Sequence, residues 1–133
     1  MDVSLVDYLF SRAEGRCEYC GIPQRFFTEL FQVEHIVARQ HRGQSDESNL
    51  AIACARCNRH KGPNLSGIDP QTDELTRLFN PRIDLWTEHF LTDVDGLIQG
   101  LTAIGRTTVY VLSMNATRRI ELRIAIRAME GSR

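Results

Sequence analysis

The sequence predicts an α+β fold with a small core in the order strand, loop, strand, helix. Two short apolar runs, at residues 30–37 and 49–53, predict the strands, because each is bounded by polar, turn-forming residues. Residues 54–60 predict a helix that ends near Gly62. A Cys-x-x-Cys pair precedes the first strand and a second pair opens the helix: Cys17 and Cys20, then Cys54 and Cys57.

Residues 3–13 predict an amphipathic helix ahead of this core. Leu5 and Leu9 recur at a helical spacing and would form the buried face, while Asp2 or Ser4 can cap the N-terminus. The helix runs directly into the first cysteine pair. We therefore expect that pair to fasten the helix to the core.

After Pro63 the pattern changes to a mixed α/β extension. Its expected elements are two strands, a short helix, a helical turn with a β-branched run, and a final helix capped by Asn115 or Thr117: residues 74–79, 96–101, 83–90, 102–112 and a last segment reaching about Met129. On the final helix we expect apolar residues inward and arginines outward: Ile120, Ile124 and Met129 against Arg118, Arg119, Arg123 and Arg127. The sequence thus predicts one domain, 1–133, with a core at 14–63 and an extension at 64–133 of unassigned role.

The charge of this 133-residue chain is nearly balanced, with a formal net charge of −1. Its distribution is uneven, because residues 35–62 carry a net +3, residues 63–117 a net −4, and residues 118–133 a net +3. Total charge gives no argument for nucleic acid. Local basic patches would have to make any phosphate contacts.

The cysteine chemistry depends on the cellular compartment. Residues 1–9 contain two aspartates and no long apolar run, and no stretch approaches the ~20 apolar residues of a membrane span. We therefore expect a cytoplasmic protein that does not bind membranes, in which thiols stay reduced. Reduced thiols in two identical pairs favour a metal site over disulfides.

Two Cys-x-x-Cys pairs with 33 residues between them can supply a tetrahedral shell of four sulfurs. Zn²⁺ fits such a shell, and closed four-cysteine sites are structural. Iron, as in an electron carrier, is an alternative occupant. Iron is the less favoured occupant, because an electron-carrier site would not explain the histidine, asparagine and arginine residues around the second pair.

The polar residues of the core resemble those of HNH endonucleases over about residues 16–61. The motifs that carry the resemblance follow in order: Cys-x-x-Cys, Glu34-His35-Ile36, Asn49-Leu50, Cys54-x-x-Cys57-Asn58 and Lys61. The extension is similar to that of small stand-alone bacterial HNH proteins, in Leu78-Phe79-Asn80-Pro81-Arg82, Trp86, His89-Phe90 and Gly105-Arg106-Thr107-Thr108. The resemblance implies a ββα-metal (treble-clef-like) core.

The resemblance also implies roles for single residues. His35 matches the general base that activates water, and Glu34 matches the acidic ligand of a catalytic metal. Asn49 matches the asparagine that fixes the loop and orients the histidine. Asn58 stands at the last motif position, often histidine, and makes this an H-N-N variant. Oxygen ligands from Glu34 and Asn58 favour Mg²⁺ or Mn²⁺ as the catalytic ion.

The expected partner is DNA, in double-stranded form, and the resemblance implies products with a 5′ phosphate and a 3′ hydroxyl. Candidate phosphate contacts are Arg56, Arg59, Lys61 and Arg106. A homodimer and a separate targeting partner are both compatible with the sequence. The alternative function is a non-catalytic, zinc-stabilised nucleic-acid-binding module, which would need neither the carboxylate of Glu34 nor the imidazole of His35.

Overall fold

The structure is a computed structural model and describes residues 1–130. The chain forms two compact units. The first unit comprises Met1–Leu65 with Asn80–Asp84, and the second comprises Ser66–Phe79 with Leu85–Arg133. The boundary expected after residue 63 falls close to the end of the first segment. Whether the two units fold as one domain stays a prediction.

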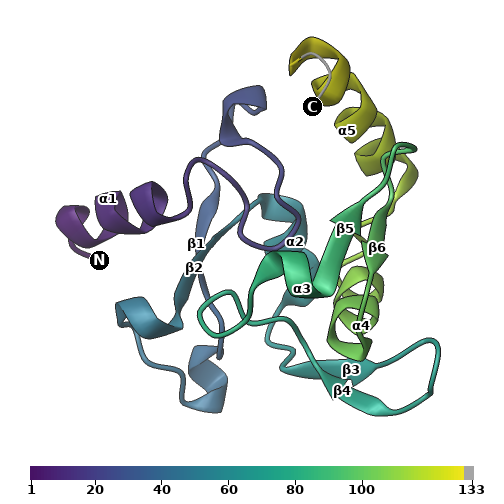
Figure 1. Cartoon of the computed structure of the whole chain (residues 1–133). Coiled ribbons are helices and arrows are strands. Elements are labelled where there is room, and N and C mark those ends of the chain that lie inside the picture. Colours follow the sequence, from purple (N-terminus) through teal and green to yellow (C-terminus); the bar gives the residue numbers. More distant parts are fainter. Residues whose placement is uncertain (131–133) are drawn as a thin grey trace. The chain divides into compact units, whose positions relative to one another are not determined.

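The first unit contains the expected strand–loop–strand–helix order (Figure 1). Strands β1 (Gln32–His35) and β2 (Leu50–Ala53) pair antiparallel, with His35 opposite Leu50. Helix α2 (Ala55–Lys61) follows and packs against both strands. Three 3₁₀ turns complete the connections: η1 (Gln24–Phe26), η2 (Arg39–His41) and η3 (Glu47–Asn49). The predicted α+β class is confirmed.

Helix α1 (Val3–Arg12) forms as predicted, and its first turn is capped by the side chain of Asp2, which accepts from the backbone N–H of Ser4. Leu9 is fully buried, and the helix packs against β2. The guanidinium of Arg12 donates to the backbone oxygens of Glu47 and Leu50. The N-terminal helix is therefore fixed to the hairpin by packing and by directed bonds.

All four residues of β2 are buried, and side chains close the strand edge that does not face β1. Glu18 donates its backbone N–H to the oxygen of Ile52, and its carboxylate accepts the N–H of Ile52. The same carboxylate pairs with Arg82, which ties the Asn80–Asp84 segment to the first unit. These contacts leave no free edge at Ile52 where another strand could pair.

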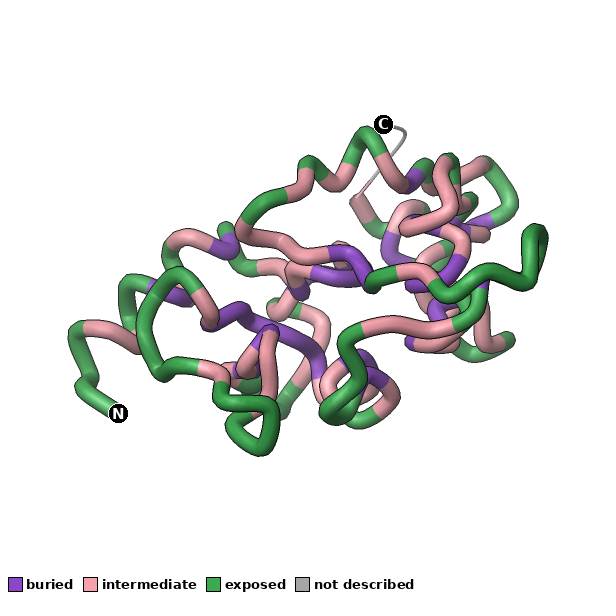
Figure 2. Tube along the Cα trace, turned by 90° about the horizontal axis from the view of Figure 1, so that it is seen from below, coloured by how far each residue is buried: buried purple, intermediate pink, exposed green. Residues whose placement is uncertain are grey.

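The second unit consists of two hairpins and three helices (Figure 1). Strand β3 (Ser66–Ile68) pairs with β4 (Leu75–Arg77), and β5 (Phe90–Thr92) pairs with β6 (Ile98–Gly100). The helices are α3 (Trp86–His89), α4 (Ala103–Val111) and α5 (Thr117–Glu130). Figure 2 shows how buried and exposed stretches alternate along the chain. Gly105 lets α4 approach the backbone of α3 closely, because a Cβ at Gly105 would lie 2.1 Å from the backbone oxygen of His89.

The expectations for the extension need several corrections. Strands β3 and β5 were not predicted, and the β-branched run lies within helix α4. Thr108 fits this helix because its hydroxyl donates to the oxygen of Ile104 and accepts from the N–H of Phe79. On α5 the predicted facing is wrong: Ile126 is buried, whereas Ile124 and Met129 are exposed.

Arg123, which was expected to face outward, turns inward instead. Its Nε donates to the oxygen of Gly96, and its Nη2 donates to the oxygen of Met114 and to Asn115 Oδ1. A guanidinium with several donors can satisfy loop carbonyls that an apolar side chain would leave unpaired. Among the described residues, no helix combines the length and the apolar character required to cross a membrane.

Candidate active site and metal centre

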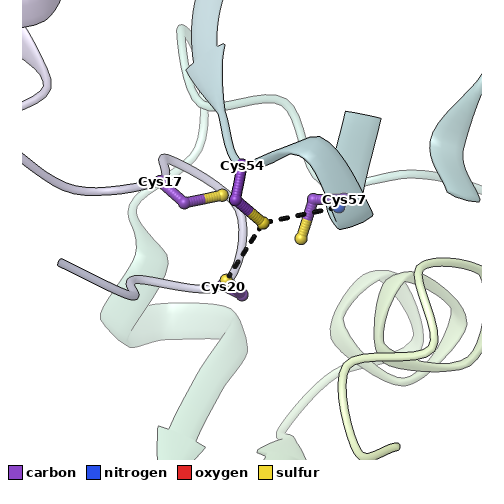
Figure 3. A group of neighbouring side chains, drawn as sticks. All are labelled: Cys17, Cys20, Cys54 and Cys57. Atoms are coloured by element: carbon purple, nitrogen blue, oxygen red, sulfur yellow. Dashed lines mark hydrogen bonds between the residues drawn. The ribbon is translucent and has the colours of Figure 1, made fainter. Parts of the chain in front are cut away.

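The four cysteines meet in one buried cluster (Figure 3). Their sulfur atoms all lie within 4.8 Å of one another, and the Sγ atoms of Cys20 and Cys54 are 3.9 Å apart. In a tetrahedral shell, Zn–S bonds of about 2.3 Å place the sulfurs about 3.8 Å apart. The separation of this pair and the donor chemistry therefore fit a structural Zn²⁺ ion.

Local backbone geometry prepares each half of the cluster. The first pair lies in a tight turn, in which Gly21 takes a φ of 79° and donates its N–H to the oxygen of Cys17. In the second pair, Cys54 is the N-cap of α2, and its Sγ accepts the N–H of Cys57 at 3.4 Å. The amide directed at the sulfur of Cys54 favours its thiolate over its thiol.

The pKa values of the buried cysteines indicate that a bound cation would stabilise the cluster. Burial raises the pKa of Cys17 well above its usual value, whereas hydrogen bonds from Cys17 and then Cys20 lower the pKa of Cys54. Buried sulfurs this close cannot all ionise without a compensating positive charge. A divalent metal supplies that charge and requires deprotonated ligands.

His35 lies at the end of β1 and is half-buried. Its Nε2 is 2.9 Å from the hydroxyl of Ser45, and Nε of Arg39 donates to it at 3.4 Å. Because a guanidinium can only donate, Nε2 is an acceptor and the ring carries its proton on Nδ1. Desolvation, and next the charge of Arg39, lowers the pKa of His35. The imidazole is therefore neutral near pH 7, as a general base must be.

Asn49 fixes the loop that brings Ser45 and Arg39 to His35. Its Nδ2 donates to the backbone oxygens of Val37 at 3.0 Å and Gln44 at 2.8 Å, and its Oδ1 accepts the N–H of Val37. Gly43 is required for this arrangement, because a Cβ there would lie 1.7 Å from the oxygen of Val37.

Glu34 points to the other side of β1 from His35, as neighbouring residues in a strand do. It is only 4% exposed. Its Oε1 lies 2.6 Å from Nζ of Lys61, and its Oε2 accepts from the hydroxyl of Tyr19 at 2.8 Å. Desolvation raises the pKa of Glu34, while Lys61 and the Tyr19 hydroxyl act against that rise. Burial, and next the charge of Glu34, raises the pKa of Tyr19, so the phenol stays protonated as a donor.

Lys61 has a different environment from the one expected. The sequence places it among the phosphate contacts, but its side chain is 2% exposed and its Nζ also donates to the oxygen of Ile36 at 2.8 Å. Its charge is directed into the protein. In this structure the Lys61 ammonium therefore forms an ion pair with the Glu34 carboxylate.

Asn58 lies on α2, on the side that faces β1. Its Nδ2 donates to the side chain of Gln32, which shares a face of β1 with Glu34. Oxygen donors from a carboxylate and an amide are the chemistry that Mg²⁺ and Mn²⁺ prefer. Glu34 and Asn58 thus offer the donor types that a hard divalent ion would take, and in this structure the Lys61 ammonium pairs with Oε1 of Glu34.

The arginines expected at phosphates differ in their surroundings. Arg59 is exposed on α2 and Arg56 is half-buried there. Arg106 belongs to the second unit and forms a forked pair with Asp69, with Nε to Oδ1 at 3.1 Å and Nη2 to Oδ2 at 2.8 Å. Asp69, which the sequence indicates only as a turn residue, is fully buried. Its pairing neutralises the charge expected to meet phosphate.

Hairpin β1–β2, helix α2 and the cysteine cluster at their ends define a small α+β domain built around a group of four cysteines that could hold a metal ion. Residues 17–64 match the family model described as HNH endonuclease, so this segment is an HNH domain. Searches of curated proteins and of solved structures found no match. An HNH domain implies nuclease-type chemistry on nucleic acid.

Proposed function

We propose that the protein is a metal-dependent HNH endonuclease that hydrolyses phosphodiester bonds in double-stranded DNA. The observation that carries this proposal is His35, a neutral, partly accessible imidazole on the hairpin of a segment that matches the HNH family. A module that only binds nucleic acid has no need for a base in this position.

In this proposal Nε2 of His35 takes the proton from the attacking water, since it is the unprotonated ring nitrogen. The Ser45 hydroxyl and the Arg39 guanidinium hold the ring, and Asn49 holds the loop that carries both. The positive charge of Arg39 also disfavours premature protonation of the imidazole. Each of these residues keeps the base oriented and neutral before substrate arrives.

Glu34 and Asn58 would hold the catalytic Mg²⁺ or Mn²⁺. When bound, such an ion supplies Lewis-acid stabilisation of the negative charge that develops on the phosphate. Arg59, exposed on α2, and Arg56 are the side chains proposed to contact flanking phosphates. Lys61 acts on this site through its carboxylate partner Glu34, whereas the guanidinium of Arg106 is paired with Asp69.

The test is cleavage of supercoiled plasmid with Mg²⁺ or Mn²⁺ by the wild type, His35→Ala and His41→Ala. His41 is an exposed histidine of η2 and serves as the matched control. We expect nicking or linearisation by the wild type and by His41→Ala. Loss of a general base should slow His35→Ala by about 10²- to 10⁴-fold.

The same preparations should be incubated with single-stranded DNA and with RNA, which tests the proposed preference for duplex DNA. Equal cleavage by wild type and His35→Ala would rule out His35 as the base. Tight binding of DNA with no cleavage in either ion would instead support the non-catalytic binding module.

A further inference from the structure

Tyr19 is a buried polar residue to which the motif resemblance gives no role. It lies between Cys17 and Cys20, within the first cysteine turn, and is 1% exposed. Its hydroxyl donates to Oε2 of Glu34 at 2.8 Å. One side chain therefore joins the structural cysteine cluster to the carboxylate of the candidate catalytic site.

Backbone hydrogen bonds fix the turn that carries Tyr19. The N–H of Cys17 donates to the oxygen of Ile22 at 3.0 Å, and the N–H of Glu18 donates to the oxygen of Ile52 at 2.9 Å. The two flanking cysteines belong to the cluster. A buried tyrosine in a turn fixed in this way has little freedom to direct its hydroxyl elsewhere.

The carboxylate of Glu34 has one partner for each oxygen. Tyr19 takes Oε2, and the Lys61 ammonium takes Oε1. A buried carboxylate with its two oxygens bound to different groups cannot rotate freely about its terminal bond. Of the two partners, the Tyr19 hydroxyl is neutral, and it does not compete with a metal cation for the carboxylate charge.

We propose that Tyr19 is a positioning residue for Glu34, through which the cysteine cluster orients the carboxylate that binds the catalytic divalent ion. The inference rests on the proposed function, because it requires Glu34 to be a ligand. Groups that hydrogen-bond to metal-ligating residues typically contribute about 10- to 100-fold to metal affinity or activity. Tyr19 should contribute within that range, without touching substrate.

The experiment compares Tyr19→Phe with the wild type, Glu34→Gln and the control Tyr110→Phe, all zinc-loaded. Tyr110 is a 70% exposed tyrosine of α4. Mn²⁺ affinity is measured by electron paramagnetic resonance of the free ion, zinc content by elemental analysis, and cleavage as separate kcat and KM values. We expect Tyr19→Phe to keep its zinc, to bind Mn²⁺ about tenfold or more weakly and to lose kcat with KM for DNA unchanged.

A second measurement does not depend on the folding of Tyr19→Phe. The chain has three tyrosines, so Tyr8→Phe with Tyr110→Phe leaves Tyr19 as the only one. Fluorotyrosine incorporated in this background gives a single fluorine resonance from position 19. We expect Mg²⁺ to shift that resonance in a saturable manner and expect no such shift when Glu34→Gln is added.

The outcomes separate the two proposals. Cleavage that disappears in His35→Ala while Tyr19→Phe matches the wild type in Mn²⁺ affinity would overturn the role of Tyr19 and leave the nuclease proposal intact. A wild type that cleaves nothing, yet binds Mn²⁺ in a manner dependent on Glu34 and Tyr19, would keep the positioning role and contradict the nuclease. The role of Tyr19 would be overturned if Glu34→Gln left the affinity for the divalent ion unchanged. It would also be overturned if Mg²⁺ did not shift the fluorine resonance.

Discussion

Nζ of Lys61 lies 2.6 Å from Oε1 of Glu34, and the two side chains are 2% and 3% exposed. A buried ion pair of this kind contributes little over an apolar pair of the same volume, but breaking it leaves an uncompensated charge. The pair also determines what each residue can do. Lys61 is withdrawn from solvent, and Glu34 is held by α2 as well as by the cysteine turn.

We predict that Lys61→Met destabilises the zinc-loaded protein by about 3–5 kcal/mol in urea unfolding, because the Glu34 carboxylate loses its counter-charge. Arg59→Met, on the exposed face of the same helix, should change stability by less than about 0.5 kcal/mol. The double variant Glu34→Gln with Lys61→Met should recover part of the loss. Equal effects of Lys61→Met and Arg59→Met would contradict the buried pair.

Cys54→Ser should remove the metal and most of the folded structure. Cys54 is both a cluster member and the N-cap of α2, and structural zinc binding is worth about 10 kcal/mol or more. Circular dichroism and elemental analysis measure the two losses together. The wild type should contain zinc; iron in its place would favour the electron-carrier alternative. A Cys54→Ser protein that melts like the wild type would argue against the site.

Asn49→Ala should lower both stability and cleavage. The side chain makes three hydrogen bonds to the backbone of the loop, and each net bond contributes about 1 kcal/mol, so a loss of about 2 kcal/mol or more is expected. Asn64→Ala replaces an exposed asparagine in the same unit and is the control. If the two variants cleave plasmid equally well, Asn49 does not orient the base.

The second unit should lose stability in acid through Asp69. The hydrogen bond from Arg106 lowers the pKa of Asp69 below the unfolded value of about 3.9. The stabilisation is therefore complete above that value and is lost as pH falls through the lower, folded-state pKa. Trp86, the single tryptophan, lies in this unit, and its fluorescence reports the transition.

Asp69→Asn should be less stable than the wild type at neutral pH, and its stability should depend less on acid. Asp73→Asn, at an exposed aspartate of the same hairpin loop, is the matched control. Superimposable acid transitions of Asp69→Asn and the wild type would show that the pair with Arg106 does not stabilise this unit.

The elements that follow from local chemistry were predictable. The strand–loop–strand–helix order and helix α1 with its Asp2 cap depend on apolar spacing and capping within a few residues. The final helix formed as expected, but the facing expected for Arg123 was wrong, because Arg123 binds carbonyls of the β5–β6 hairpin turn and the segment before α5. The spacing of apolar residues along the helix cannot predict those acceptors.

By itself the sequence determined the cysteine cluster and the order of the HNH motif, since both depend on residue types at short spacings. Tertiary structure alone decided the partners of the charged and polar groups. Lys61 meets Glu34 across 27 positions, and Arg106 meets Asp69 across 37. A charge can face solvent, phosphate or a buried partner with the same local sequence, and only the packing of distant segments selects one.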